Sequence, residues 1–214
     1  MRLYTYFRST SSYRVRIALA LKGIPCVQVP VHLARNGGEQ NAPAYRLLNP
    51  QGRVPTLVLD DGTALLQSPA IIEYLEDSHP MPALLPQAAA ERAKVRAVAA
   101  IIGCDVHPLN NISALNYLRH VLGTNEDAVS AWIAHWIRAG FDAVEDLIGE
   151  EGFCFGLTPS IADIYLIPQV FSARRFNVPL DAYPRIRRVD AMAARHPAFQ
   201  SAHPSRQADA EPAG

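Results

Sequence analysis

Apolar residues are spaced differently in the two parts of the chain, and the change falls near residue 80. In the first part, short β-rich runs alternate with a segment of helical length. Residues 3–6 and 26–31 predict strands, and residues 11–22 between them predict a helix. Gly23 stands where a helix C-terminus favours glycine. The beginning of the chain therefore predicts a βαβ unit.

Two more strand-like runs, 57–60 and 63–66, flank the pair Asp61-Gly62, which is typical of a tight hairpin turn. The segment 37–48 before them predicts a short irregular helix. This part of the chain therefore predicts a β-hairpin preceded by a short helical connection.

A helix over 68–77 follows the hairpin, with Ser68 as its N-cap and Pro69 as its first helical residue. The full order is βαβ followed by ββα. A parallel βαβ unit joined to a hairpin and a closing helix is a thioredoxin-like pattern. We therefore expect a thioredoxin-like α/β domain over residues 1–80.

Helical spacing dominates the second part of the chain. Residues 78–87 contain three prolines and predict a linker, which we assign to 81–87, ahead of an all-helical domain over 88–214. The first predicted helix covers 88–119 and is kinked or divided near Pro108. A second helix is capped by Thr124, a third opens with a capping box from Ser160 to Asp163, and the last covers 184–196. The polar tail from about residue 203 is expected to be mobile.

Aromatic residues lie in the helix that follows Thr124. Apolar residues there recur every three to four positions, at Ala128, Trp132, Trp136, Ala139, Ala143 and Leu147. We therefore expect Trp132 and Trp136 to lie in the core.

Composition narrows the class of protein. Hydrophobic residues make up 49% of the 214 residues, so the chain should fold, and 20 basic residues balance 20 acidic ones, so no net basic field favours nucleic acid. No apolar run is long enough for a membrane span, and the first residues lack the apolar segment of a signal peptide. Cys26, Cys104 and Cys154 have no metal-ligand spacing, so we expect free thiols in a reducing cytoplasm.

Several motifs together resemble one family. The loop and helix start RSTSSYRVRIAL over residues 8–19 is similar to the serine-rich signature of zeta-class glutathione transferases, whose members include maleylacetoacetate and maleylpyruvate isomerases. The other matching segments are NP at 49–50, VPT at 54–56, QS at 67–68, IIEYL at 71–75, HPLNN at 107–111, PQV at 168–170 and RRF at 174–176. The resemblance covers nearly the whole chain and implies a thioredoxin-like domain followed by a helical one.

The serine-rich loop is the implied catalytic segment, with Ser9, Thr10 and Ser11 as candidates and Ser9 first among them by its place in the motif. Small hydroxyl residues before a helix are also ordinary N-caps. In the family reading, a hydroxyl donates to the sulfur of glutathione while the helix N-terminus adds partial positive charge. Many zeta-class enzymes have cysteine where this chain has Ser11, so no role here can need a protein thiol.

The resemblance also implies where glutathione binds. Val54 would pair with the cysteinyl part of the tripeptide because Pro55 is cis in the family, and Gln67 with Ser68 would hold the γ-glutamyl carboxylate at a helix start. Gln40 is a candidate for the glycine end, although a solvated loop glutamine is the alternative.

In the helical part, His107 and Asn111 are four residues apart and therefore share a helix face. The resemblance implies that they line the cleft between the domains, near glutathione or the substrate. The alternative is a polar patch around a proline kink. Arg8 and Arg175 would bind the carboxylates of the substrate, because guanidinium groups pair with carboxylates in a bidentate manner, whereas Arg174 would be solvated.

The implied activity is a glutathione-dependent cis–trans isomerisation of maleylacetoacetate to fumarylacetoacetate in aromatic amino-acid catabolism. Glutathione is the expected cofactor, no metal is needed, and the expected partners are a small dicarboxylic substrate and a second copy of the chain in a homodimer, without nucleic acid or membrane. Three alternatives stay open: maleylpyruvate isomerisation, glutathione conjugation of small α-haloacids, and a non-catalytic binding protein of the same fold.

Overall fold

A computed structural model of the chain describes residues 1–211, and these fall into two compact units. The sheet unit comprises Met1–Ala83 together with residues 195–211, and the helical unit comprises Leu84–Ala194. The sequence predicted one helical domain over 88–214. The structure instead groups the residues after Ala194 with the sheet, because their contacts are to the first helix and the loop before it.

The sheet unit is built on four strands in the order β2-β1-β3-β4. The strands are β1 Arg2–Thr5, β2 Val27–Pro30, β3 Thr56–Val58 and β4 Ala64–Leu66. β1 and β2 are parallel, whereas β3 is antiparallel to both of its neighbours. The predicted βαβ unit and hairpin are therefore confirmed.

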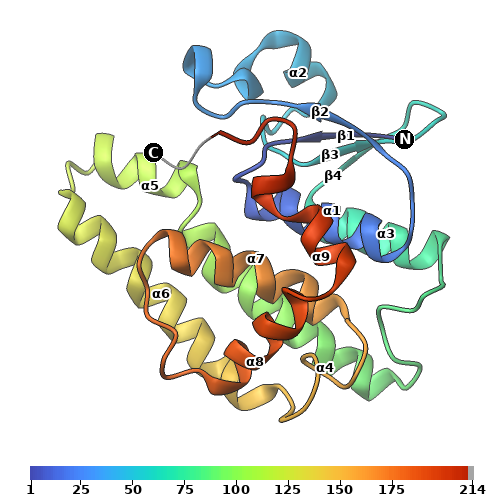
Figure 1. Cartoon of the computed structure of the whole chain (residues 1–214). Helices are drawn as coiled ribbons and strands as arrows, with labels where there is room; N and C mark the ends of the chain where they lie inside the picture. The colour runs from blue at the N-terminus through green and yellow to red at the C-terminus, as the bar shows by residue number, and fades with distance from the viewer. Residues whose placement is uncertain (212–214) are drawn as a thin grey trace. The chain divides into compact units, whose positions relative to one another are not determined.

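Four helices belong to this unit: α1 Thr10–Leu21, α2 Pro43–Leu48, α3 Ser68–Ser78 and α9 Pro197–Ala202. α1 packs against both α3 and α9, and Figure 1 shows the last of these helices running beside the first. Three short 3₁₀ turns, Arg35–Gly37, Glu39–Asn41 and Pro204–Arg206, complete the unit.

The starts of α1 and α3 differ from the prediction. The hydroxyl of Ser9 caps α1 by accepting a hydrogen bond from the Ser12 N–H at 3.2 Å. The helix therefore begins at Thr10, one residue earlier than predicted. Ser68 is the first residue of α3 and not its N-cap; the cap position belongs to Gln67, which makes no side-chain capping bond. The prediction of Ser68 as N-cap is therefore wrong, because the unusual backbone of Gln67 already turns the chain into the helix.

The helical unit begins with one long but irregular run. It consists of α4 Ala89–Ala100, a π-helical stretch Ile101–Val106, a 3₁₀ turn His107–Leu109 and α5 Ile112–His120. The sequence predicted that the helix over 88–119 is either kinked or divided near Pro108. The structure shows that it is divided there. Proline has no N–H to donate and its ring disfavours a continuing helix.

The remaining helices of this unit are α6 Glu126–Leu147, α7 Ile161–Arg175 and α8 Pro184–Ala193. α7 is almost wholly buried and packs against α4 and α8. The predicted last helix over 184–196 ends at Ala193, and α9 follows in the sheet unit.

The helix α6 corrects two predictions. Its cap is Asn125, whose side chain accepts from the Ala128 N–H at 2.9 Å, and not Thr124. Its buried stripe is Val129, Ile133, Ile137, Gly140, Phe141 and Val144. Trp132 and Trp136 are only partly buried, and the Trp132 indole N–H donates to the Leu109 carbonyl at 2.7 Å. Valine and isoleucine side chains together with Phe141, and not the tryptophans, therefore form the buried face of α6.

The predicted capping box at the start of α7 is confirmed. The carboxylate of Asp163 accepts hydrogen bonds from the N–H and Oγ of Ser160, each at 2.8 Å, and from the Cys154 N–H at 2.8 Å. Burial raises the pKa of the Asp163 carboxyl, and these donors oppose that shift by stabilising the charged form.

Replacing Asp163 should therefore destabilise the fold. We expect Asp163→Asn to lower the free energy of unfolding by about 2 kcal/mol, because buried donors lose a charged acceptor. Urea unfolding monitored by circular dichroism measures the change. Asp146→Asn, at an exposed position of α6, is the matched control and should stay within about 0.5 kcal/mol of the parent protein. Equal effects from the two variants would contradict this role of Asp163.

The C-terminal segment does not match the expected mobile tail over the residues that the structure describes. The Gln207 side chain is buried and donates to the carbonyls of Ser201 and His203 at 3.0 and 2.8 Å. Glu211 accepts from Arg35 at 2.6 Å and lies 3.2 Å from the Nε2 of His32. Polar side chains hold this segment, so a polar composition alone did not indicate mobility. Among the described residues, none of the helices has the length and apolar character that a membrane crossing needs.

Candidate active site

Four loops converge at one edge of the sheet. The register pairs Tyr4 with Thr56 and Thr56 with Leu66, and Thr5 with Pro30. The ends of β1, β2 and β4 and the start of β3 therefore lie at the same edge. The loop 6–9, the chain after Pro30, the turn 54–55 and residue 67 all leave the sheet there. The sequence-predicted candidates of the sheet unit sit in these four connections.

The loop from β1 to α1 presents the candidate hydroxyls. The Ser9 N–H donates to the Tyr6 carbonyl at 3.0 Å, which fixes Ser9 directly before the helix. Its Oγ accepts from Ser12, and accepting leaves the hydroxyl hydrogen available to donate. Ser9 and Ser11 are partly buried, whereas Thr10 is buried. Among the three candidates, Ser9 thus combines accessibility with a fixed place at the positive end of α1.

The bond between Val54 and Pro55 is cis, as the resemblance implied. Two buried side chains hold the surrounding turn. The Asn49 amide donates to the Arg53 carbonyl at 2.8 Å and to the Thr56 hydroxyl at 3.0 Å. The Tyr45 hydroxyl donates to the same carbonyl at 2.7 Å. Asn49 belongs to one of the segments that match the family, but its residue type alone indicates no role, and nothing in the sequence singles out Tyr45.

Gln67 has a φ of 68° and a ψ of 123°, a conformation that residues with a side chain rarely adopt. Such outliers concentrate at functional sites, where the surrounding structure enforces them. Its side-chain amide hydrogen-bonds the side chain of Gln51, a residue that the sequence did not single out. Ser68, the next residue, is buried at the first position of α3.

Gln40 lies in the connection after β2. Its Nε2 makes a long hydrogen bond of 3.4 Å to the Leu33 carbonyl, and its Oε1 is buried without a partner among the described residues. A buried acceptor of this kind favours a ligand that donates to it. This supports Gln40 as a binding residue over the alternative of a solvated loop side chain.

In the helical unit, the two candidates do not lie on one regular helix. His107 begins the 3₁₀ turn, whereas Asn111 is the N-cap of α5, where its side chain accepts from the N–H groups of Ser113 and Ala114 at 2.9 and 3.1 Å. The prediction that they share a helix face is wrong, because the helical hydrogen-bond pattern is interrupted between them. Asn111 has a structural role that the sequence analysis did not assign.

The two adjacent arginines at the end of α7 differ in their contacts. Arg174 is paired with Asp190 of α8, with nitrogen–oxygen distances of 2.5 and 3.2 Å. Arg175 is exposed, and its guanidinium lies 4.5 Å from the centre of the Phe176 ring. In the sheet unit, the Arg8 guanidinium lies 5.1 Å from the Phe7 ring centre. Arg174 is thus exposed but ion-paired, and not merely solvated.

The start of α1 and the start of α3 meet at the sheet edge, so two helix N-termini supply partial positive charge and N–H donors there. The Ser9 hydroxyl, the buried Ser68 and the unpartnered Oε1 of Gln40 lie in the connections at the same edge. This arrangement suits a peptide-like ligand with carboxylate and thiolate groups.

Comparison with known proteins gives the same picture. Residues 3–83 match the model of the glutathione S-transferase N-terminal domain, and residues 126–189 match that of the C-terminal domain. The chain is 60% identical over 209 residues to a maleylacetoacetate isomerase of Pseudomonas aeruginosa, with 98% of each chain covered.

Two solved structures are similar to the whole chain. One is the holo form of a bacterial maleylpyruvate isomerase, described as a zeta-class glutathione S-transferase, with a TM-score of 0.94, 50% identity and 99% and 100% of the two chains covered. The other is a maleylacetoacetate isomerase of Methylobacterium extorquens AM1 with bound malonate and glutathione, with a TM-score of 0.92, 33% identity and coverage of 99% and 100%. The chain belongs to the glutathione S-transferase family and, with these relatives, to its zeta class.

Proposed function

We propose that this chain is a glutathione-dependent cis–trans isomerase that converts maleylacetoacetate to fumarylacetoacetate. The observation that carries the proposal is the placement of the Ser9 hydroxyl at the N-terminus of α1, at the sheet edge where the turn 54–55 and the start of α3 also lie. The 60% identity to a maleylacetoacetate isomerase over the whole chain supports the choice of reaction.

The residues of this edge fit glutathione. Ser68 and the N–H groups at the start of α3 suit the γ-glutamyl carboxylate, because a helix N-terminus favours an anion. The backbone of Val54 suits the cysteinyl peptide, and the unpartnered Oε1 of Gln40 suits a donor near the glycine end. We assign Ser9 to the thiol, with Thr10 and Ser11 as the hydroxyls next in line. His107 and Asn111 remain candidates for contacts with the cofactor.

Bound glutathione would supply the thiolate nucleophile whose reversible addition lets the cis double bond of a maleyl substrate rotate. The chain itself must keep the thiol deprotonated and must orient the substrate. The Ser9 hydroxyl donates toward the sulfur, and the α1 terminus adds partial positive charge. Arg8 and Arg175 bind the carboxylates of the substrate, since a planar guanidinium fixes both position and orientation.

One assay tests the proposal directly. Purified protein is mixed with glutathione and, in separate reactions, with maleylacetoacetate, maleylpyruvate or a small α-haloacid, and product formation is followed spectrophotometrically. We expect the largest kcat/KM for maleylacetoacetate. Maleylpyruvate is the second candidate, because the holo structure of a maleylpyruvate isomerase is 50% identical to this chain. Retention on immobilised glutathione without turnover of any substrate would instead indicate a non-catalytic binding protein.

We also propose that the protein is a homodimer. Homo-oligomers are most often two-fold dimers. The chain mass is 23.4 kDa, so static light scattering should give about 47 kDa in dilute solution. A mass of one chain at the same concentration would reject the dimer.

A cytoplasmic location and a place in aromatic amino-acid catabolism complete the proposal. All three cysteines are free, which suits a compartment in which glutathione is kept reduced.

A further inference from the structure

The loop that carries Ser9 is held from both sides by groups far from it in sequence. The Phe7 N–H donates to Asp209 Oδ2 at 3.0 Å, across a sequence separation of 202 residues. The Phe7 carbonyl accepts from Arg16 Nη2 at 3.1 Å. Both polar groups of the Phe7 backbone are therefore engaged, two residues before the candidate catalytic serine.

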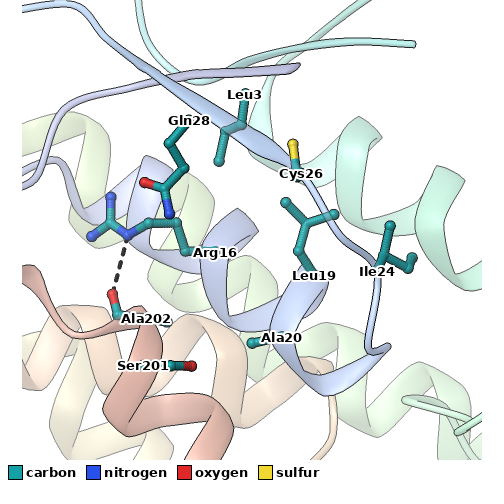
Figure 2. Close-up of a pocket in the computed structure, with 9 residues that line it drawn as sticks. All are labelled: Leu3, Arg16, Leu19, Ala20, Ile24, Cys26, Gln28, Ser201 and Ala202. Carbon is teal, nitrogen blue, oxygen red and sulfur yellow. Dashed lines mark hydrogen bonds between the residues drawn. The ribbon is translucent and has the colours of Figure 1, made fainter. Parts of the chain in front are cut away.

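Arg16 is the centre of this arrangement. The residue is 3% exposed, and its guanidinium makes four hydrogen bonds. The acceptors are the Thr5 hydroxyl at 3.1 Å, the Tyr6 carbonyl at 3.3 Å, the Phe7 carbonyl at 3.1 Å and the Ala202 carbonyl at 3.1 Å. Figure 2 shows the bond to Ala202, which joins α1 to α9; both residues line a small cavity of about 170 Å³. One side chain thus connects the end of β1, the serine loop and the C-terminal segment.

The network reaches Ser9 through a shared acceptor. The Tyr6 carbonyl accepts from the Ser9 N–H at 3.0 Å as well as from Arg16 Nη1. A displacement of Arg16 therefore shifts the carbonyl that fixes the backbone of Ser9.

The charges of Arg16 and Asp209 also favour their placement near one another. All four acceptors of Arg16 are neutral groups, so its buried charge depends on more distant compensation. Burial lowers the pKa of Arg16 to about 10, while Tyr13 and, to a smaller extent, the negative charge of Asp209 act in the opposite direction. Arg16 remains charged at neutral pH, and Asp209 stabilises that charge while it accepts from the loop.

We propose that Arg16 and Asp209 are positioning residues for the thiolate site. They hold the loop 6–9 so that the Ser9 hydroxyl points at the glutathione sulfur. Asp209 then makes the C-terminal segment contribute to the site through a single side chain. The inference rests on the proposed function of Ser9.

The test uses the full-length chain with Asp209→Ala, because Asp209 is only partly buried and its replacement leaves the core intact. We expect kcat for maleylacetoacetate to fall by about threefold to tenfold, since small displacements of a catalytic group are costly. The pKa of the bound glutathione thiol, read from thiolate absorbance in the ultraviolet, should rise, while the KM for glutathione changes less than about twofold. Asp209→Asn keeps an acceptor oxygen, so both its kcat and its thiol pKa should lie between those of Asp209→Ala and the parent protein.

Glu211→Ala is the matched control. Glu211 belongs to the same segment but contacts His32 and Arg35 and not the serine loop. It should leave kcat and the thiol pKa unchanged. Arg16→Lys is the second variant, compared with the parent protein at temperatures below its melting point; a three-donor ammonium cannot reproduce four bonds in a fork, so we expect the same shift in thiol pKa as for Asp209→Ala.

The outcomes separate this inference from the proposed function. Unchanged kcat and thiol pKa in Asp209→Ala, with both altered in Ser9→Ala, would overturn the positioning role and leave Ser9 in place. Equal effects of Asp209→Ala and Glu211→Ala would also overturn it, because general attachment of the segment would then be responsible. Unchanged values in Ser9→Ala would reject the role of Ser9 itself, whatever Asp209 does.

Discussion

Replacing Ser9 by alanine is expected to lower isomerase turnover by about tenfold or more and to raise the pKa of enzyme-bound glutathione. A free thiol has a pKa of about 8.5 and is mostly protonated at neutral pH. Lowering that pKa by about two units corresponds to roughly 2.7 kcal/mol. One charge-assisted hydrogen bond of about 1.5–3 kcal/mol together with a helix N-terminus supplies that amount. Ultraviolet titration of the complex with glutathione measures the shift.

The structure makes the choice of variants important, because the Ser9 hydroxyl also caps α1. Alanine removes the cap as well as the donor, at a cost of about 1 kcal/mol in stability. Glycine is a nearly neutral cap, so Ser9→Gly removes the donor alone, and Ser9→Thr keeps both functions. Ser9→Gly should therefore match Ser9→Ala in thiol pKa, while Ser9→Thr stays near the parent value. A parent-like pKa in Ser9→Gly would move the role to Thr10, Ser11 or the helix terminus.

Much of the sheet unit is predictable because its local signals agree with its tertiary contacts. The Asp61-Gly62 pair marks the hairpin, and Gly23 ends the first helix with a φ of 64°. Alternating strand and helix signals then leave few topologies. The loop candidates Ser9, Thr10 and Ser11 belong to one contiguous motif, so the sequence alone brings them together. Gln40, Val54 and Gln67 reach the same edge only through the strand register.

The errors lie where several residues offer the same signal. Thr124 and Asn125 are adjacent residues that are both good N-caps, so residue type alone does not show that Asn125 takes the position. Apolar residues occupy more than one face of α6, so spacing alone did not separate the buried Ile133 and Ile137 from the partly buried tryptophans. His107 and Asn111 have helical spacing, but a proline between them breaks the helix.

The positioning residues could not be predicted at all. The bond between Phe7 and Asp209 joins opposite ends of the chain, and nothing in the neighbourhood of either residue indicates the other. Arg16 lies in the family motif, but its position in the predicted helix does not show which groups its side chain would contact. A polar segment near a chain end favours mobility in sequence terms, and only its partners in the fold reverse that expectation.

The arginine that we assign to the substrate carboxylate provides the second large effect. Arg175→Ala should raise the KM for the maleyl substrate by about tenfold to a few hundredfold, which matches about 1.5–3 kcal/mol for a charged hydrogen bond. Glutathione affinity should stay within about twofold, because the guanidinium acts on the acyl substrate. Arg175→Lys should recover only part of the loss, since an ammonium cannot replace a planar fork. Steady-state kinetics with each substrate varied in turn measures both quantities.

The adjacent arginine is the matched control for this prediction. The Arg174 guanidinium is paired with Asp190 of α8, whose side chain is only 16% exposed. Because that pairing engages Arg174 within the helical unit, Arg174→Ala should leave both KM values near those of the parent protein. Arg175 is exposed, and its guanidinium lies over the Phe176 ring, 4.5 Å from the ring centre. Equal increases in KM from the two variants would mean that general loss of positive charge at the end of α7 is responsible. Loss of glutathione binding in Arg175→Ala would assign that arginine to the cofactor, and the recognition of a dicarboxylate would then rest on Arg8.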